Sequence, residues 1–151
     1  MIATGRESLE LSIKSDAAQA SLPWWISLSV IVGALLMGTG AIIALVRPAM
    51  LVGPGAEITA AVRVYAGYLV SRNLVLALML LAMLTLRARR ALSTLMVLTG
   101  FIQLFDAGLD VTEKRWGIAP GVLIFAIVFF LGAARLNGQP FWKLAAWRNA
   151  S

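Results

Sequence analysis

The sequence of 151 residues contains no cysteine and no histidine. The absence of cysteine excludes disulfide bonds, thiolate metal sites and a cysteine nucleophile. The absence of histidine removes the commonest protein ligand of zinc, haem and non-haem iron, and also the commonest general base. The sequence also has no phosphate-binding loop and no dinucleotide-binding fingerprint. We therefore expect neither a bound metal ion nor an organic cofactor.

Charged residues are also scarce, at 13% of the chain, whereas hydrophobic residues make up 60%. An ordinary soluble domain has about 25% charged and about 45–50% apolar residues. The apolar residues of this chain come in runs long enough to cross a bilayer. The sequence therefore predicts an all-α integral membrane protein, a bundle of four transmembrane helices surrounded by membrane lipid.

The predicted transmembrane domain covers residues 23–136. We expect a cytoplasmic N-terminal tail over residues 1–22 and an interfacial tail over residues 137–151, where aromatic and basic side chains suit the membrane surface. Proline, glycine and arginine residues bound the apolar runs. The predicted spans are about residues 24–46, 57–86, 91–111 and 118–136.

The basic residues predict the orientation of the chain. Twice as many Lys and Arg residues flank the side that holds both tails and the turn at 87–90 as flank the opposite side. The positive-inside rule then places both termini in the cytoplasm of a multi-pass protein of the inner membrane. The net charge of +6 follows from this topology. We expect no nucleic-acid partner, because no basic helix interleaved with aromatic residues is present.

Two polar stripes lie inside the predicted second and third spans, where a charge costs at least about 2.5–3.5 kcal/mol on insertion scales. Residues in each stripe follow the spacing i, i+3, i+7, which places them on one face of a helix. The stripes consist of Tyr65, Tyr68 and Arg72 in one span and of Gln103, Asp106 and Asp110 in the other. Residues of this kind inside a membrane are candidate functional groups.

The second and third spans are predicted to be antiparallel neighbours, because only a tight turn near Arg89 joins them. Counting outward from that turn places Arg72 level with Asp106, and Tyr68 level with Asp110. We therefore expect Arg72 to meet Asp106 and Tyr68 to reach Asp110. In this interpretation Asp110 has no cation of its own.

Two interpretations of the stripes stay open. In the first, the stripes line a pocket that binds an apolar molecule, lipid-like or terpenoid, from the bilayer. In the second, Arg72 and Asp106 form an ion pair that fixes helix register in a non-catalytic membrane subunit. Such a subunit would assemble with further copies of itself or with a partner of a larger, for example redox, complex.

The sequence leaves open whether the protein is an enzyme. If it is, acid–base chemistry without a cofactor fits the residues best: isomerisation, cyclisation or epoxide opening. Asp106 or Asp110 would give or take the proton, and Arg72 would stabilise the developing negative charge. The predicted substrate-binding residues are Tyr65, Tyr68, Gln103 and Asn73.

The run RVYAGYLVSRNLVLALMLL at residues 63–81 resembles the central motif of small bacterial four-helix membrane proteins, the DoxX-like group and a related family of unknown function. Their pattern has an Arg, a Gly a few residues later, an Arg that opens a Leu-rich helix, and an Asp in the next span. Those places are filled here by Arg63, Gly67, Arg72 and Asp106. The Gly that often follows the second Arg is missing, since Ala77 and Leu78 stand there. The resemblance implies a four-helix fold and a membrane location. Because some members of the wider group are associated with oxidoreductases, it also implies an accessory role.

Overall fold

The computed structural model describes residues 22–52, 57–139 and 142–143, and within these it is entirely helical, with no strand. The expected tails at 1–22 and 137–151 therefore lie mostly outside the described residues. The helical elements are α2 (Trp24–Val46), the short 3₁₀ helix η1 (Pro48–Leu51), α3 (Ala60–Thr85), α4 (Arg89–Thr112) and α5 (Ala119–Asn137).

The long helices of the described chain match the four predicted spans in number and kind. They contain 23, 26, 24 and 19 residues. A helix rises about 1.5 Å per residue, so that about twenty residues cross the hydrocarbon core of a bilayer. All four are long and apolar enough to cross a membrane. This confirms the prediction of an all-α chain with four membrane-spanning candidates.

The helix ends differ from the prediction by a few residues. Helix α2 covers the range expected from the sequence. Helix α3 begins at Ala60 rather than near residue 57, because the side chain of Thr59 caps it by accepting a hydrogen bond from Val62 N at 3.4 Å. Helix α4 begins at Arg89, two residues earlier than expected, because residues 86–88 suffice to connect it to α3.

The turns that follow α3 and α4 have the same backbone conformation. A basic residue follows each helix in the left-handed region, Arg87 with φ 53° and Lys114 with φ 57°. The next N–H donates to the carbonyl five residues back, from Ala88 to Met83 at 3.0 Å and from Arg115 to Asp110 at 2.7 Å. This is the Schellman motif, which usually holds glycine at the left-handed position. Both turns therefore keep a positive charge at a position that favours glycine.

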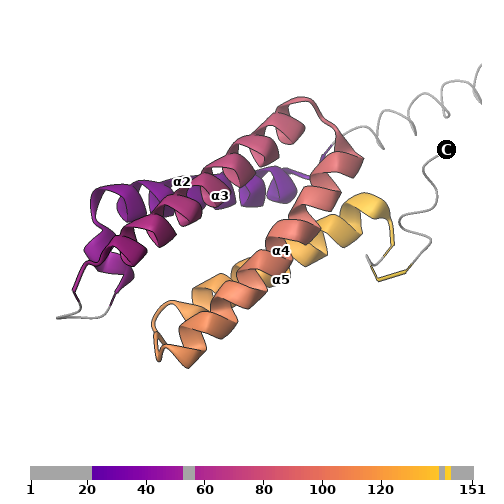
Figure 1. The fold of residues 1–151 in the computed structure, drawn as a ribbon. Helices are drawn as coiled ribbons and strands as arrows, with labels where there is room; N and C mark the ends of the chain where they lie inside the picture. Colours follow the sequence, from indigo (N-terminus) through magenta and orange to yellow (C-terminus); the bar gives the residue numbers. More distant parts are fainter. Residues whose placement is uncertain (1–21, 53–56, 140–141, 144–151) are drawn as a thin grey trace, which may run out of the picture.

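The four helices form two hairpins. Helix α2 packs along α3 and α4 packs along α5, whereas α3 contacts α4 over a much shorter stretch and α2 contacts α5 over a shorter one still. Figure 1 shows the hairpins joined near the turn at residues 86–88 and diverging from there toward their other ends. The fold is therefore a pair of splayed hairpins rather than an evenly packed bundle.

The apolar core lies at the joined end. Its members come from the first half of α2, the second half of α3, the first half of α4 and the second half of α5. Those that are most deeply buried include Ile26, Val30, Leu80, Leu92, Met96 and Phe129. The ring of Phe129 is fully buried and lies against Gly33 of α2, so that it links the two hairpins.

The contact at Gly33 gives a test of how the hairpins are joined. A Cβ atom at Gly33 would lie 2.7 Å from Cζ of Phe129 and 2.8 Å from Cε1 of Phe125. We expect Gly33→Ala to lower the free energy of unfolding by about 1–3 kcal/mol, because overpacking pushes the hairpins apart. The measurement is equilibrium unfolding by sodium dodecyl sulfate in mixed micelles.

The matched control for this prediction is Gly38→Ala in the same helix. A Cβ atom there would meet no atom within 4 Å. We expect this variant to be at least as stable as the parent, since alanine favours the helix by up to about 1 kcal/mol over glycine. Equal stability of the two variants would show that the contact between Gly33 and Phe129 does not hold the hairpins together.

Candidate functional site

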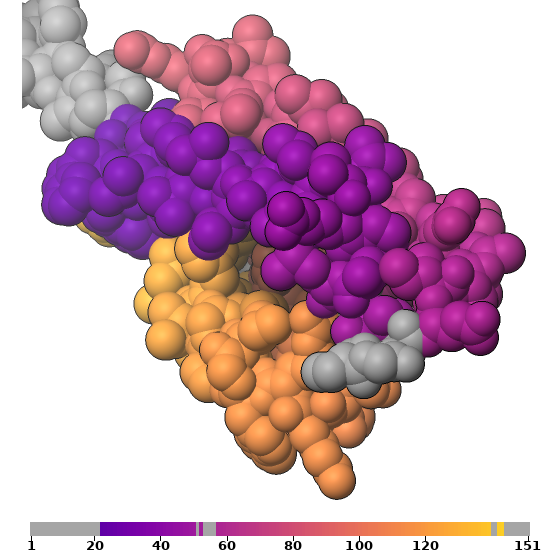
Figure 2. All heavy atoms as spheres, turned by 90° about the vertical axis from the view of Figure 1, so that its left-hand side faces the viewer, coloured from indigo at the N-terminus to yellow at the C-terminus, as the bar shows by residue number. Residues whose placement is uncertain are grey.

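A hollow opens between the hairpins at the end away from the 86–88 turn. Figure 2 looks on to this open end and shows the hollow between the layer of α2 and α3, in indigo to magenta, and the layer of α4 and α5, in orange to yellow. Arg72 lies on α3 and Asp106 on α4, in the halves of these helices that lead away from the joined end. The polar stripes therefore belong to the two helices whose separation creates the hollow.

Arg72 and Asp106 form an ion pair that bridges the two hairpins. Nη2 of Arg72 lies 2.9 Å from Oδ2 of Asp106, the distance of a charge-assisted hydrogen bond. The two side chains nevertheless keep 38% and 32% of their surface exposed. The pair is thus only partly buried and is not sealed inside a dry helix contact.

The surroundings of the pair leave hydrogen-bonding capacity unused. Nε of Arg72 donates to Oδ1 of Asn73 at 3.4 Å, a long bond between neighbours in α3. Oδ1 of Asp106 has no hydrogen-bond partner among the described residues, and neither has the partly buried side chain of Gln103. The structure therefore brings together Arg72, Asn73 and Asp106, with Gln103 one turn away on the same face of α4.

Asp110 has a cation, contrary to the expectation from the sequence. Its Oδ1 lies 3.6 Å from Nη1 of Arg115, and its side chain is 14% exposed. The cause is the Schellman turn after α4, in which Arg115 folds back over the last turn of the helix. Asp110 is therefore part of a second ion pair nearer the end of α4, which weakens the case for it as an independent acid.

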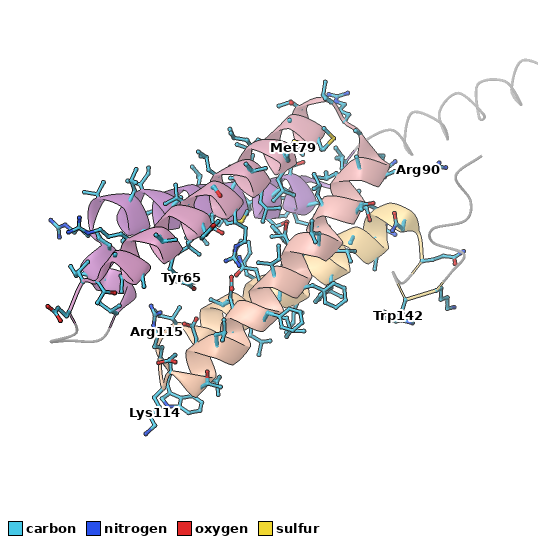
Figure 3. All side chains as sticks on the ribbon, in the orientation of Figure 1. Tyr65, Met79, Arg90, Lys114, Arg115 and Trp142 are labelled. Atoms are coloured by element: carbon cyan, nitrogen blue, oxygen red, sulfur yellow. The ribbon has the colours of Figure 1, made fainter. Side chains whose placement is uncertain are left out.

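Tyr65 and Tyr68 lie farther from the ion pairs than expected. Their side chains are 57% and 73% exposed, and within the described residues Tyr68 makes no hydrogen bond to Asp110. Because the helices diverge, residues at equal depth near the open end are too far apart to touch. Figure 3 shows Tyr65 and Arg115, from opposite hairpins, at the two sides of the gap. Tyr65 therefore lies on the α3 side of the open end, across the gap from Arg115.

The predicted set of site residues omits Arg115 and Thr99. Arg115 follows Asp110 by five residues, beyond the i, i+3, i+4 spacings that place side chains together on a helix. Thr99 precedes Asp106 by seven residues and so shares its face of α4. Its hydroxyl is buried without a hydrogen-bond partner among the described residues. The seven-residue spacing was the signal that could have identified Thr99.

No protein-family model, curated protein or solved structure matches this chain. The resemblance of residues 63–81 to the DoxX-like group therefore stays a prediction. Of the four positions in that pattern, the structure pairs Arg72 with Asp106. Arg63 is exposed near the start of α3, and a Cβ atom at Gly67 would meet no atom within 4 Å. The evidence on function is therefore the geometry around Arg72 and Asp106.

The ion pair predicts a characteristic pattern of mutational effects. We expect Arg72→Met and Asp106→Leu each to lower the unfolding free energy by about 1–2 kcal/mol, because each leaves the opposite charge without a partner in apolar surroundings. The double variant should recover most of that loss, since no unpaired charge remains. Unfolding in mixed micelles, arranged as a double-mutant cycle, measures the coupling.

Glu113→Gln serves as the control for this cycle, because Glu113 is exposed at the end of α4. We expect its effect to stay within about 0.5 kcal/mol. A double variant whose loss equals the sum of the two single losses would show that Arg72 and Asp106 are not coupled.

Proposed function

We propose that this chain is a multi-pass protein of the inner membrane that binds a neutral amphiphile, lipid-like or terpenoid, between its two hairpins. The polar head would bond to Arg72 and Asp106, and the apolar part would lie in the hollow. The observation that carries this proposal is the partly exposed ion pair that joins α3 of one hairpin to α4 of the other. Because the pair is partly exposed, its remaining donors and acceptors can bond to a ligand.

The chemistry of the pair favours a neutral head group. A guanidinium offers several N–H donors, and the free oxygen of the carboxylate accepts, so that a hydroxyl or carboxamide group could bond to both partners. The pair is neutral overall, and a charged head would leave an unbalanced charge among apolar side chains. The low dielectric constant of such surroundings strengthens each hydrogen bond made there.

Chemical conversion of the bound molecule would be an extension of this binding role. Asp106 would then transfer the proton, and Arg72 would stabilise negative charge on an oxygen of the substrate. Both carboxylates have an arginine partner, and Asp106 is the one whose partner lies on the other hairpin. Each of the acid–base reactions expected from the sequence needs one such proton-transferring group.

The alternative is a non-catalytic subunit whose hollow receives a helix of a partner or of a second copy. One observation favours it: the pair of Arg72 and Asp106 ties together two hairpins that otherwise contact each other mainly at one end. In that case the occupant of the hollow would be a protein helix rather than a small amphiphile.

Analysis of co-purified molecules distinguishes these functions. The parent protein and the Arg72→Met, Asp106→Leu double variant are purified from the same membranes, and their bound lipids and proteins are identified by mass spectrometry. We expect a neutral amphiphile to be depleted about tenfold in the double variant, as the loss of one to two hydrogen bonds predicts. Glu113→Gln, the matched control, should retain it.

Two outcomes of this experiment would contradict the binding proposal. If the parent and the double variant carry the same small molecules in the same amounts, the pair binds no amphiphile. If the double variant instead loses a co-purified protein or its own oligomer, the subunit function is supported in place of ligand binding.

The orientation of the chain can be tested by cysteine labelling, for which the cysteine-free sequence is well suited. Both termini are proposed to be cytoplasmic, which places the 86–88 turn inside and the turn after α4 outside. We expect a membrane-impermeant maleimide to label Glu113→Cys in intact spheroplasts and Leu86→Cys only after permeabilisation. Both positions are exposed in the structure. The reverse labelling pattern would invert the topology.

A further inference from the structure

The hydroxyl group of Thr99 is buried in α4 without a partner. Thr99 is fully enclosed, and its Oγ1 has no hydrogen bond among the described residues. Other hydroxyl groups of the same helix are satisfied: Ser93 donates to the carbonyl of Ala133 in α5, and Thr94 to that of Arg90, each at 3.1 Å. A buried polar group without a partner is costly and uncommon, so Thr99 calls for an explanation.

Thr99 lies in line with the proposed site. Thr99, Gln103 and Asp106 follow one another at spacings of four and three residues, on one face of α4. From Asp106 to Thr99 the distance along the helix axis is two turns, about 10 Å. Leu92, seven residues before Thr99 on the same face, belongs to the core at the joined end. Thr99 therefore marks the boundary between the apolar core and the polar stripe of Gln103, Asp106 and Asp110.

We propose that the ligand site extends along α4 from the ion pair to Thr99, and that its ligand carries a second polar group about 10 Å from the first. This inference rests on the proposed function, because Arg72 and Asp106 hold the first polar group. The ligand is then an elongated neutral amphiphile with a hydroxyl or carbonyl group at each end. The hydroxyl of Thr99 both donates and accepts, so that it can bond to either group.

The packing of the hairpins allows such a ligand to reach Thr99. In the structure the hydroxyl is enclosed, so the far end of the ligand must displace side chains at the floor of the hollow. Helices α3 and α4 contact each other much less extensively than the two helices within each hairpin do. Extending the hollow by one to two turns therefore breaks few contacts. The bond to Thr99 then supplies the partner that its hydroxyl lacks in the free protein.

The test compares alcohols that carry one or two hydroxyl groups. The probes are hexanediol, octanediol and decanediol with their hydroxyls at the two chain ends, together with the matching mono-alcohols. Binding to the full chain in nanodiscs is measured by equilibrium titration, with empty nanodiscs subtracted. We expect the diol of matching length to bind about fivefold more tightly than its mono-alcohol, the gain from one hydrogen bond.

Two variants test whether the preference for the diol depends on the hydroxyl of Thr99. Thr99→Val keeps the shape of the side chain and removes the hydroxyl, so we expect it to abolish the preference for the diol. It should leave the melting temperature of the ligand-free protein unchanged or higher, because it removes an unpaired polar group. Ser93→Ala is the matched control: it removes a hydroxyl that has a protein partner, and should lower the melting temperature while keeping the preference for the diol.

Failure of this inference and failure of the proposed function give different results. If the parent binds diols and mono-alcohols equally, or if Thr99→Val keeps the preference, the extension to Thr99 is wrong. The proposed function survives that outcome when the Arg72→Met, Asp106→Leu double variant weakens the binding of both kinds of alcohol. If no alcohol binds, or if the double variant binds them as the parent does, both proposals are overturned.

Discussion

An ionised guanidinium on a membrane-spanning helix needs a partner within reach, because the surrounding hydrocarbon cannot solvate it. Arg72 meets this requirement across the gap between two hairpins, at Asp106 of α4. The hairpins pack closely at one end, where Phe129 lies against Gly33. The ion pair lies where this packing gives way to the hollow. The position of the core along the helices therefore determines how much of the ion pair remains accessible.

The number and type of the helices could be predicted from the sequence, because a long apolar run crosses a membrane as an α-helix. The contact between Arg72 and Asp106 could also be anticipated, since a tight turn fixes the relative depth of two helices. The divergence of the hairpins could not, because it depends on side-chain volume. Gly33 faces two phenylalanine rings, whereas Gly38 in the same helix faces open space, and hydropathy does not distinguish these glycines.

The errors at Arg115 and Tyr68 depend on how a helix ends and on how neighbouring helices tilt. Arg115 reaches Asp110 because a Schellman turn reverses the chain after α4, with Lys114 at the left-handed position where glycine is usual. Neither turn has a glycine at the left-handed position, so the sequence did not indicate the motif. Tyr68 makes no hydrogen bond to Asp110, although the two residues were predicted to lie at the same depth in the membrane. Equal depth leads to contact only where α3 and α4 stay close together. Thr99 was not predicted as a site residue because threonine is common in membrane helices. Only the structure shows that its hydroxyl has no hydrogen-bond partner among the described residues.

The joining of the hairpins at one end has a mechanical consequence. Two rigid arms that meet near a three-residue connection behave as a pair of levers, and a small change of angle at the core becomes a larger displacement at the open end. Side-chain packing fixes the angle only near the core, so the acyl chains around the open end exert lateral pressure on the distance between the arms. The thickness and curvature stress of the surrounding leaflet would thereby affect the separation of the two hairpins. If the proposed amphiphile binds between the hairpins, the composition of the bilayer would then affect how much of it is bound, without a separate regulatory site on the protein.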